Sequence, residues 1–258
     1  REAPSYGAPK LLIELYLLNG GIDMLEVILF DLDGTLVPMD LDYFTKSYMQ
    51  ALCTKFFDLI PPQKLVHEIW QGTYRIANDL DPGRTNKDVF WEYFLPKFSI
   101  DAEILISMFD DFYNQDFAQL KKTTKPNPDA RSVIDTLLEK GYRVGIATNP
   151  IFPARAIEER LNWVGVADLP YSLVTTYEKM HYCKPHVEYY QEIVEMIDVC
   201  PERCLMVGND VEEDLAARKL GMKTFLVEDC LLNTRNLNIK TDYRGSFAGL
   251  VEFIEELP

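Results

Sequence analysis

A short apolar run at residues 27–30 constrains the fold more than any other feature of this sequence. It contains only Val, Ile, Leu and Phe, and it ends abruptly in the polar sequence Asp31-Leu-Asp33-Gly-Thr35. A continuous apolar run of this length is typical of a strand that is buried on both faces of a parallel sheet. We therefore expect a core strand that delivers polar side chains at its carboxyl end.

Alternating strand and helix patterns fill the second half of the chain. A helix is predicted to begin at Asn127-Pro128, because Asn is a good N-cap and Pro is favoured at the first helical position. Strands are then predicted at 143–147, 171–175, 204–207 and 223–227, with helices at 153–161, 187–197 and 211–220. This alternation predicts an α/β fold in which helices cover both faces of a parallel, Rossmann-like sheet.

Residues 41–122 follow a different pattern, which is helical throughout. Apolar and aromatic residues recur there at helical spacing, as at Leu41, Phe44, Tyr48 and Leu52. The segment is divided into roughly four helices by breaks at Pro61-Pro62, Asp81-Pro82-Gly83 and Pro96. We expect an inserted α-helical bundle of this size to form a cap on the core.

The predicted domain organisation has three parts. Residues 24–39 and 123–258 form the core, residues 40–122 form the cap, and residues 1–23 form an N-terminal extension of uncertain origin. The extension is set apart because Met24 directly precedes the first strand signal. A chain of 258 residues is long enough for a core domain that carries a smaller inserted one.

The charge balance limits the partners of the protein. Lys and Arg number 26 against 41 Asp and Glu, which gives a net charge of −15. Such a chain has no global basic field to attract a nucleic-acid backbone or an anionic membrane, so we expect neither as a partner. A divalent cation can still reverse the local sign inside a cleft that binds a small phosphorylated substrate. The composition leaves the oligomeric state open.

Cysteine usage and hydropathy indicate a soluble protein. The five cysteines are scattered and form no CxxC pair, which indicates neither a disulfide framework nor a thiolate zinc site. The apolar stretch at residues 11–18 is too short to span a bilayer. We therefore expect a cytoplasmic location.

Polar residues follow the predicted strands at the points where these strands end. Ligands of a parallel α/β sheet bind outside the carboxyl ends of its strands, so we expect these side chains to converge in space. They are Asp31, Asp33, Thr148, Asn149, Lys184, Asn209, Asp210 and Asp214.

The order of these residues resembles the haloacid dehalogenase superfamily, specifically its phosphatase branch. The motifs of that branch are matched in order by Asp31-Leu-Asp33-Gly-Thr35, Thr148, Lys184, and Gly208-Asn-Asp210 with Asp214. Together they cover about residues 25–228. The resemblance implies a haloacid dehalogenase-like core with a helical cap inserted between the first and second motifs. It also implies phosphoryl rather than carbon chemistry, because dehalogenases of the superfamily are expected to lack the second acid.

Two carboxylates of the first motif can carry the chemistry. Asp31 is the candidate nucleophile, because a carboxylate can attack phosphorus and split one difficult displacement into two easier ones. Asp33 suits the general acid that protonates the leaving oxygen and the base that later deprotonates water. The predicted catalytic set is Asp31, Asp33, Thr148 and Lys184.

Phosphate and metal binding follow from the need to balance charge. Thr148, Asn149 and Lys184 offer donors and a positive charge to the phosphoryl group beside Asp31. Carboxylates and phosphate repel one another, so the site needs a hard cation with oxygen ligands, for which Mg²⁺ is the usual choice. The predicted metal set is Asp31, Asp33, Asp210 and Asp214. Asn209 stands where the family often has an acid, which is expected to weaken metal binding modestly.

The predicted function is that of a magnesium-dependent phosphatase that hydrolyses a small phosphorylated metabolite through an aspartyl-phosphate. Two alternatives remain: a phosphomutase of the same superfamily, and a non-catalytic binding or regulatory protein that keeps the fold. Substrate choice is expected to rest with the cap. The predicted substrate contacts, just after the first motif, are Asp40, Asp42, Tyr43 and Lys46.

Overall fold

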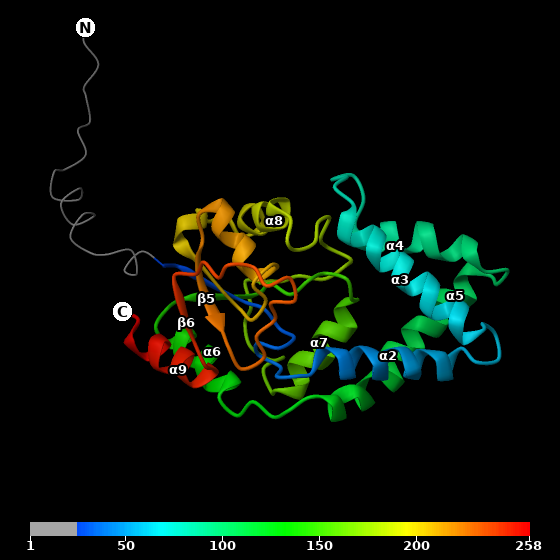
Figure 1. The fold of residues 1–258 in the computed structure, drawn as a ribbon, viewed down its shortest axis with the longest axis horizontal. Helices are drawn as coiled ribbons and strands as arrows, with labels where there is room; N and C mark the ends of the chain where they lie inside the picture. Colours follow the sequence, from blue (N-terminus) through cyan, green and yellow to red (C-terminus); the bar gives the residue numbers. More distant parts are fainter. Residues whose placement is uncertain (1–24) are drawn as a thin grey trace, which may run out of the picture.

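The computed structural model describes residues 25–258, so the predicted extension at residues 1–23 lies outside the described part of the chain. A sheet of six strands forms the centre of the core, and its neighbouring strands are all parallel (Figure 1). The strands, in their order across the sheet, are β3 (Leu173–Val174), β2 (Arg143–Ile146), β1 (Val27–Phe30), β4 (Cys204–Gly208), β5 (Lys223–Val227) and β6 (Tyr243–Gly245). The predicted parallel α/β fold is confirmed.

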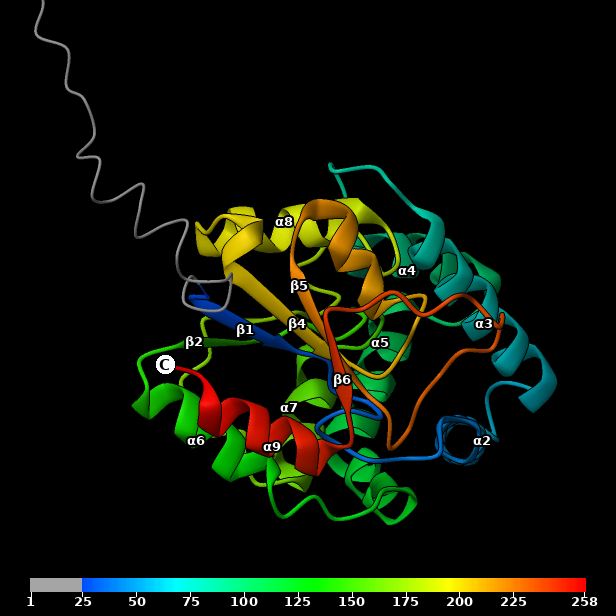
Figure 2. The ribbon, with the colours of Figure 1, turned by 60° about the vertical axis from the view of Figure 1, so that its left-hand side comes forward.

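Helices cover both faces of the sheet. The core contains α6 (Ala130–Glu139), α7 (Ala154–Trp163), α8 (Val187–Ile197) and α9 (Phe247–Glu256), with the short 3-10 segments η4 (Pro201–Arg203) and η5 (Asp214–Leu220). Figure 2 shows α8 on one side of β1 and β4, and α6 and α9 on the other side. The sequence pattern did not predict β6 or α9, and η5 takes the place of the later part of the helix predicted at 211–220.

The central strand β1 explains why the first apolar run carries no polar residue. It pairs with β2 on one side and with β4 on the other, and all four of its side chains are fully buried. Ile28 and Phe30 belong to the hydrophobic cluster that contains α6, α7 and α9, whereas Val27 and Leu29 belong to the cluster that contains α8. Successive side chains of a strand point to opposite faces, so every position needs an apolar residue.

Between β1 and α6 the chain forms the predicted helical insertion. Its elements are α2 (Leu41–Lys55), α3 (Pro62–Asn78), α4 (Asn86–Phe94), η1 (Leu95–Lys97), α5 (Ala102–Asp111), the π-helical segment η2 (Phe112–Asp116) and η3 (Phe117–Thr123). Pro62 stands in the first turn of α3, and Thr85 and Asp88 cap the start of α4 reciprocally. Figure 1 shows these helices to one side of the sheet. We refer to the insertion as the cap; the domain boundaries at 40–122 stay a prediction.

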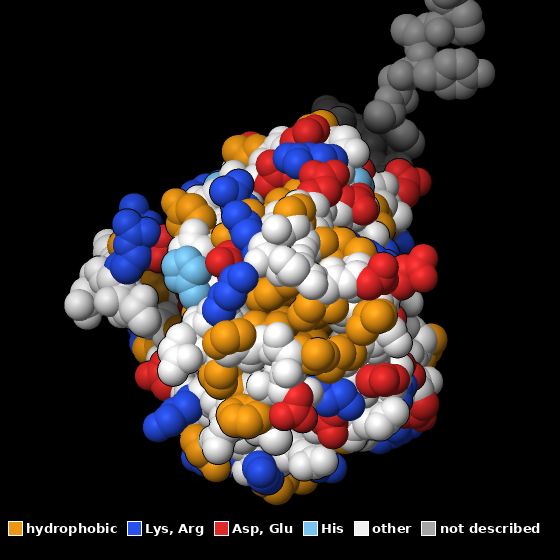
Figure 3. Space-filling model, turned by 90° about the vertical axis from the view of Figure 1, so that its right-hand side faces the viewer, with side chains coloured by type: hydrophobic (Ala, Val, Ile, Leu, Met, Phe, Trp, Pro, Cys, Tyr) orange, Lys and Arg blue, Asp and Glu red, His pale blue; other side chains and the backbone are white. Residues whose placement is uncertain are grey.

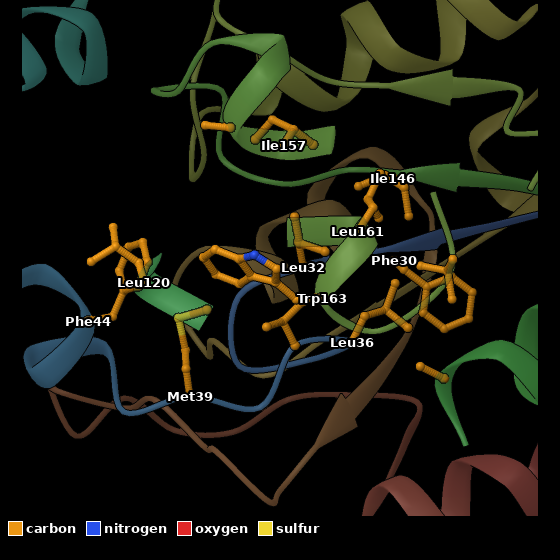
Figure 4. Packing of buried hydrophobic residues seen from close by; sticks show 14 of the residues in the cluster. Phe30, Leu32, Leu36, Met39, Phe44, Leu120, Ile146, Ile157, Leu161 and Trp163 are labelled. Carbon is orange, nitrogen blue, oxygen red and sulfur yellow. The ribbon is translucent and has the colours of Figure 1, made fainter. Parts of the chain in front are cut away.

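The cap and the core share one hydrophobic cluster, which includes aromatic contacts between the two. The ring of Trp163, at the end of α7, stacks on Phe117 with centroids 5.5 Å apart, and Phe44 of α2 approaches it edge-on at 6.5 Å. Figure 4 shows Trp163 between Phe44 and Leu120 of the cap and Leu32 of the core. Aromatic pairs of this kind contribute about 0.5–1.5 kcal/mol each beyond the area that they bury. The cap is therefore packed on the core and is not held by its linkers alone.

Two linkers connect the cap to the core, and they run side by side. Met39 in the first linker and Thr124 in the second form an antiparallel bridge. Next to it, the N–H of Lys125 donates to the carbonyl of Pro38 at 2.8 Å. The chain therefore enters and leaves the cap at one place.

The start of α6 differs from the prediction. The helix begins at Ala130 and not at Pro128. The side chain of Asn127 donates to the carbonyl of Leu36 in the first linker, at 3.0 Å. The side chain predicted to cap the helix therefore forms a tertiary hydrogen bond between the two linkers instead.

The cap carries hydrophobic side chains on its surface as well as inside. Figure 3 shows hydrophobic side chains gathered across the middle of the face at the cap end of the molecule, with charged side chains around them. Phe57, Trp70, Tyr74 and Ile104 of the cap are each at least half exposed. Within residues 25–258, no helix is both long enough and apolar enough to cross a bilayer.

Candidate active site

The polar residues that follow the strands meet at the carboxyl edge of the sheet. Asp31 directly follows β1 and Asn209 directly follows β4, while Thr148 comes two residues after β2. These three strands are neighbours, so their ends lie together. The floor of a cavity of about 280 Å³ is formed there by Asp31, Asp33, Thr148, Asn149, Asn209, Asp210, Glu213 and Asp214. The cap supplies most of the walls.

Lys184 links two carboxylates beneath this floor. Its Nζ donates to Asp31 Oδ1 at 2.8 Å and to Asp214 Oδ1 at 2.6 Å, and the lysine side chain is fully buried. Burial opposes the charge of the ammonium group, but Asp214 and Asp31 outweigh this effect and raise the pKa of Lys184 well above its usual value. A permanently charged lysine between two carboxylates fixes the position of the Asp31 side chain.

Asp33 is held by a second buried cation. Arg160 Nη1 donates to Asp33 Oδ2, and the arginine side chain is fully buried. Its guanidinium also lies over the ring of Phe152, 4.5 Å from the centroid. Burial raises the pKa of Asp33, and Arg160 opposes the rise. The other oxygen of Asp33, Oδ1, is buried and has no hydrogen-bond partner within residues 25–258. The hydrogen-bonding capacity of this oxygen is therefore unused in the described chain.

Sequence reasoning missed Arg160, although a signal for it exists. It belongs to α7, in which Ala156, Ile157 and Leu161 lie on the buried face. Residue 160 has the helical spacing of that same face. An arginine that the helical period places among core residues needs an acidic partner there, because a buried unpaired charge is very costly.

Asn209 ties the first and fourth motifs together. Its Oδ1 accepts from the hydroxyl of Thr35 at 3.0 Å, and its Nδ2 donates to the carbonyl of Cys230 at 2.7 Å. Gly34 lies directly against it, with a φ of +89° and space so tight that a Cβ atom would lie 2.4 Å from Asn209 Nδ2. An aspartate at 209 would face the Cys230 carbonyl with no hydrogen to donate. This geometry gives a physical reason for the amide at the position where the family often has an acid.

Asp210 and Asp214 organise the turn that follows β4. Asp210 Oδ1 accepts from the N–H groups of Glu212 and Glu213, at 2.7 and 2.8 Å, and the Asp210 N–H donates to Asp214 Oδ2 at 2.8 Å. A Cβ atom at Gly208 would lie 2.1 Å from Asp214 Oδ2. The glycine therefore makes room for the carboxylate that contacts the buried lysine.

Thr148 and Asn149 complete the floor beside β2. The Thr148 carbonyl accepts from the hydroxyls of Thr175 and Tyr189, at 2.7 and 2.9 Å, which fixes the backbone where its side chain lines the cavity. Asn149 Nδ2 donates to Glu213 Oε1 at 3.0 Å. Burial is the main cause that raises the pKa of Glu213 to about 8. Glu213 is a second residue of the site that sequence reasoning missed, and it lines the cavity; it lies between two motif acids in the sequence.

The cavity floor carries the type of ligand atom, carboxylate oxygen, that a hard cation prefers. Five acidic side chains line the cavity, and Asp210 Oδ2 accepts no hydrogen bond from residues 25–258. Carboxylate oxygens are the ligands that Mg²⁺ prefers. Within the described chain, however, no three acidic, His or Cys side chains converge on one point as a metal site. Lys184 lies between Asp31 and Asp214, which keeps these two carboxylates apart.

The four substrate contacts predicted on the cap face solvent. Asp40, Asp42, Tyr43 and Lys46 are all exposed, and none of them is among the cavity-lining residues of the described chain. Asp40 instead caps α2, because its side chain accepts from the N–H of Tyr43 at 2.9 Å. Phe44 and Tyr48 of the same helix line the cavity. The helical period turns the two sets to different faces.

The arrangement of these residues along the chain matches a known protein family. Residues 25–221 match the sequence model of the hydrolase family described as haloacid dehalogenase-like hydrolase. The chain belongs to this family. The resemblance drawn from the four motifs is thereby confirmed.

Relatives of this haloacid dehalogenase-like hydrolase include two phosphatases. A glyceraldehyde 3-phosphate phosphatase from Methanothermobacter thermautotrophicus is 28% identical over 208 residues, which cover 79% of this chain and 86% of that protein. The pyrophosphatase PpaX from Bacillus cereus (strain Q1) is 24% identical over 203 residues, which cover 79% and 83%. The solved structure of a HAD phosphatase from Thermococcus onnurineus has the same fold, with a TM-score of 0.55 at 18% identity over 89% of this chain and 98% of that one.

Proposed function

We propose that this protein is a Mg²⁺-dependent phosphatase that hydrolyses a small phosphorylated metabolite through an aspartyl-phosphate on Asp31. The enzyme class, phosphoric monoester hydrolase, follows from the family and from the two related phosphatases. One observation carries the proposal. The Asp31 carboxylate, fixed by Lys184 at 2.8 Å, shares the cavity floor with Asp33, whose buried Oδ1 has no partner within residues 25–258.

In the first step, a carboxylate oxygen of Asp31 attacks phosphorus and the bond from phosphorus to the leaving oxygen breaks. Asp33 gives its proton to that leaving oxygen, so that an alcohol departs and not an alkoxide. The raised pKa of Asp33 suits a group that must hold a proton before the reaction begins. Thr148 on the cavity floor, and the charge of Lys184 from beneath Asp31, stabilise the charge on the transferring oxygens.

In the second step, water attacks phosphorus and the bond to the Asp31 oxygen breaks. Asp33, now ionised, takes the proton of the attacking water and returns to its starting state as phosphate leaves. We propose that Asp31 and Asp210 hold Mg²⁺ and that Asp214 orients them. When bound, the ion offsets the repulsion between these carboxylates and the phosphate. The sequence also placed Asp33 in the metal set. Because Asp33 is bonded to Arg160, we propose that its side chain takes part in proton transfer only.

The test combines activity with trapping. We expect the purified protein with Mg²⁺ to release inorganic phosphate from p-nitrophenyl phosphate, and rapid acid quench followed by mass spectrometry to detect one phosphoryl group on Asp31. A chelator should stop the reaction, and Asp31→Asn should give neither product nor adduct. Turnover with no phosphoryl adduct at any time point, or turnover in excess chelator, would contradict the mechanism.

Product analysis separates the alternatives. A phosphomutase would convert a sugar phosphate into its isomer without net release of phosphate. A non-catalytic protein would bind phosphorylated ligands without turnover in either assay. Both aspartates that these reactions need are present on the cavity floor, which favours an active enzyme.

We also propose a reducing cytoplasmic location and small-molecule partners, not nucleic acid or membrane. None of the five cysteines forms a disulfide. Such usage is typical of a reducing compartment.

A further inference from the structure

The walls of the active-site cavity differ in chemistry from its floor. The cap contributes twelve lining residues, all uncharged, of which ten are hydrophobic or aromatic. They include the rings of Phe44, Tyr48, Trp70, Phe90 and Trp91. A leaving group that extends from the phosphoryl position toward the cap therefore meets aromatic and aliphatic surface.

The cavity offers no free cation to a second anionic group of a substrate. The charged side chains that line it within residues 25–258 are all acidic. The two cations that contact these acids, Lys184 and Arg160, are fully buried and are not among the residues that line the cavity. Lys184 bonds to both Asp31 and Asp214, and Arg160 bonds to Asp33. A carboxylate or a second phosphate of the substrate would be buried against rings without a partner, which is strongly unfavourable.

Polar groups in the walls are few. The cap contributes the hydroxyls of Thr45 and Thr73, and other polar groups bond to one another. The hydroxyls of Tyr48 and Tyr113 lie 2.7 Å apart, and Trp91 Nε1 donates to the hydroxyl of Tyr177 at 3.4 Å. A sugar-like leaving group would exchange many hydrogen bonds to water for two threonine hydroxyls and these paired groups. The walls thus disfavour polyols as well as anions.

We propose that the substrate is a phosphomonoester of an uncharged, predominantly apolar alcohol or phenol with no second anionic group. The inference rests on the proposed phosphatase function and adds the class of its leaving group. The cavity volume of about 280 Å³ lies just below the roughly 300–1,000 Å³ typical of ligand pockets, which suits a phosphoryl group with a single ring or a short alkyl chain.

The test uses substrate pairs matched in leaving-group chemistry, because aryl and alkyl phosphates differ in intrinsic reactivity. Benzyl phosphate is compared with 4-carboxybenzyl phosphate, and hexyl phosphate with its ω-carboxylate analogue. We expect kcat/KM to be about 100-fold or more higher for the uncharged member of each pair. Pyrophosphate and glucose 6-phosphate should be poorer than benzyl phosphate. Equal values within a pair, or a preference for the carboxylate, would overturn the inference.

A designed cation sharpens the test. Thr73 of α3 lines the cavity and is half-buried, whereas Gln71 of the same helix is exposed and does not line it. Thr73→Lys should raise kcat/KM for 4-carboxybenzyl phosphate at least about tenfold and lower it for benzyl phosphate. Thr73→Met, of similar length without charge, should not produce this rescue, and neither should Gln71→Lys. Rescue by Gln71→Lys would show a general charge effect and overturn the inference.

Failure of the inference and failure of the proposed function have different outcomes. If none of these compounds, including p-nitrophenyl phosphate, releases phosphate in the presence of Mg²⁺, the phosphatase proposal itself is wrong. If anionic or polyol substrates are hydrolysed best and this activity is lost in Asp31→Asn, the phosphatase proposal stands and the apolar leaving group is wrong.

Discussion

The two buried cations beneath the cavity are used in different ways. Lys184 divides its ammonium group between two carboxylates, Asp31 and Asp214, at 2.8 and 2.6 Å. Arg160 holds one oxygen of Asp33, while Asp33 Oδ1 and Arg160 Nη2 are both buried without a hydrogen-bond partner in the described chain.

The difference suits the two roles that we propose, a nucleophile that must stay in place at Asp31 and an acid that must exchange a proton at Asp33. A fully satisfied buried network is rigid, which suits a nucleophile that has to meet phosphorus at one geometry. An acid with a free oxygen can still bond to the leaving group. We therefore expect substitutions at the two clusters to differ in kind. Those around Lys184 should disturb the placement of the Asp31 carboxylate, and those around Arg160 should change the pKa of Asp33.

The largest effect is expected at Asp31, the proposed nucleophile. Asp31→Asn keeps the shape and still presents an oxygen to Lys184, but an amide is a poor nucleophile, so kcat should fall by about 10⁴-fold or more. Phosphate release at saturating Mg²⁺ measures this loss, and circular dichroism checks that the fold is unchanged. A folded variant with kcat within tenfold of the unaltered enzyme would refute the covalent role.

The next largest effect is expected at Asp33, the proposed general acid. Asp33→Asn cannot donate a strongly acidic proton, so kcat for an alkyl phosphate should fall by about 10²- to 10⁴-fold. The loss should be much smaller for p-nitrophenyl phosphate, because p-nitrophenolate departs without protonation. Hydrolysis rates of the two substrates are compared in the same variant. Equal losses on both would argue against proton donation by Asp33.

Substitutions at the three polar residues of the fourth motif should change the Mg²⁺ requirement to three different extents. Asp210→Ala should raise the Mg²⁺ concentration for half-maximal activity most, and Asp214→Ala by about 10- to 100-fold, because that residue orients a ligand. Asn209→Ala should have the smallest effect on metal but lower the free energy of unfolding by about 1–3 kcal/mol, since it leaves polar partners unsatisfied. Metal titration and thermal melts measure the two effects. A dominant metal effect of Asn209→Ala would reverse our assignment.

The smallest loss at the optimal pH is expected for Arg160. The guanidinium lowers the pKa of Asp33, so its removal in Arg160→Met should raise that pKa further. The limb of the pH–rate profile that reports Asp33 should then move to higher pH by about one to three units. Arg160→Lys keeps the charge and should restore most of the profile. A fall in rate with an unmoved profile would indicate a purely structural role.

The core could be predicted from the sequence because its determinants are local. The apolar run that forms β1 specifies its own burial, and the residues of helix α8 match the predicted range of 187–197. Asp31, Thr148 and Asp210 stand at strand ends, where the topology of a parallel sheet brings them together without further information. The weak signals were β6, a three-residue strand in which no residue is fully buried, and the short 3-10 segment η5.

The rest of the site depends on tertiary contacts that no local pattern encodes. The sequence offered Asp40, Asp42, Tyr43 and Lys46 as substrate contacts because they follow the first motif, yet the direction of α2 turns Phe44 and Tyr48 to the cavity instead. In the same way, Arg160 meets Asp33 across 127 positions of sequence. Polar residues near a motif are easily recognised in a sequence. Apolar residues that line a cavity have the same helical spacing as residues of a packed helix core, so only the structure distinguishes them.

The paired linkers at Met39 and Thr124 bear on how such an enzyme can diversify. Because both connections pass through one bridge, a recombination event could exchange the whole cap while leaving the carboxyl edge of the sheet in register. The foreign cap would have to carry its own counterparts of Phe44 and Phe117, because the ring of Trp163 packs against these two rings. Chimeras in which a foreign cap is joined at these two points should keep the phosphoryl chemistry and acquire the substrate specificity of the protein that donated the cap.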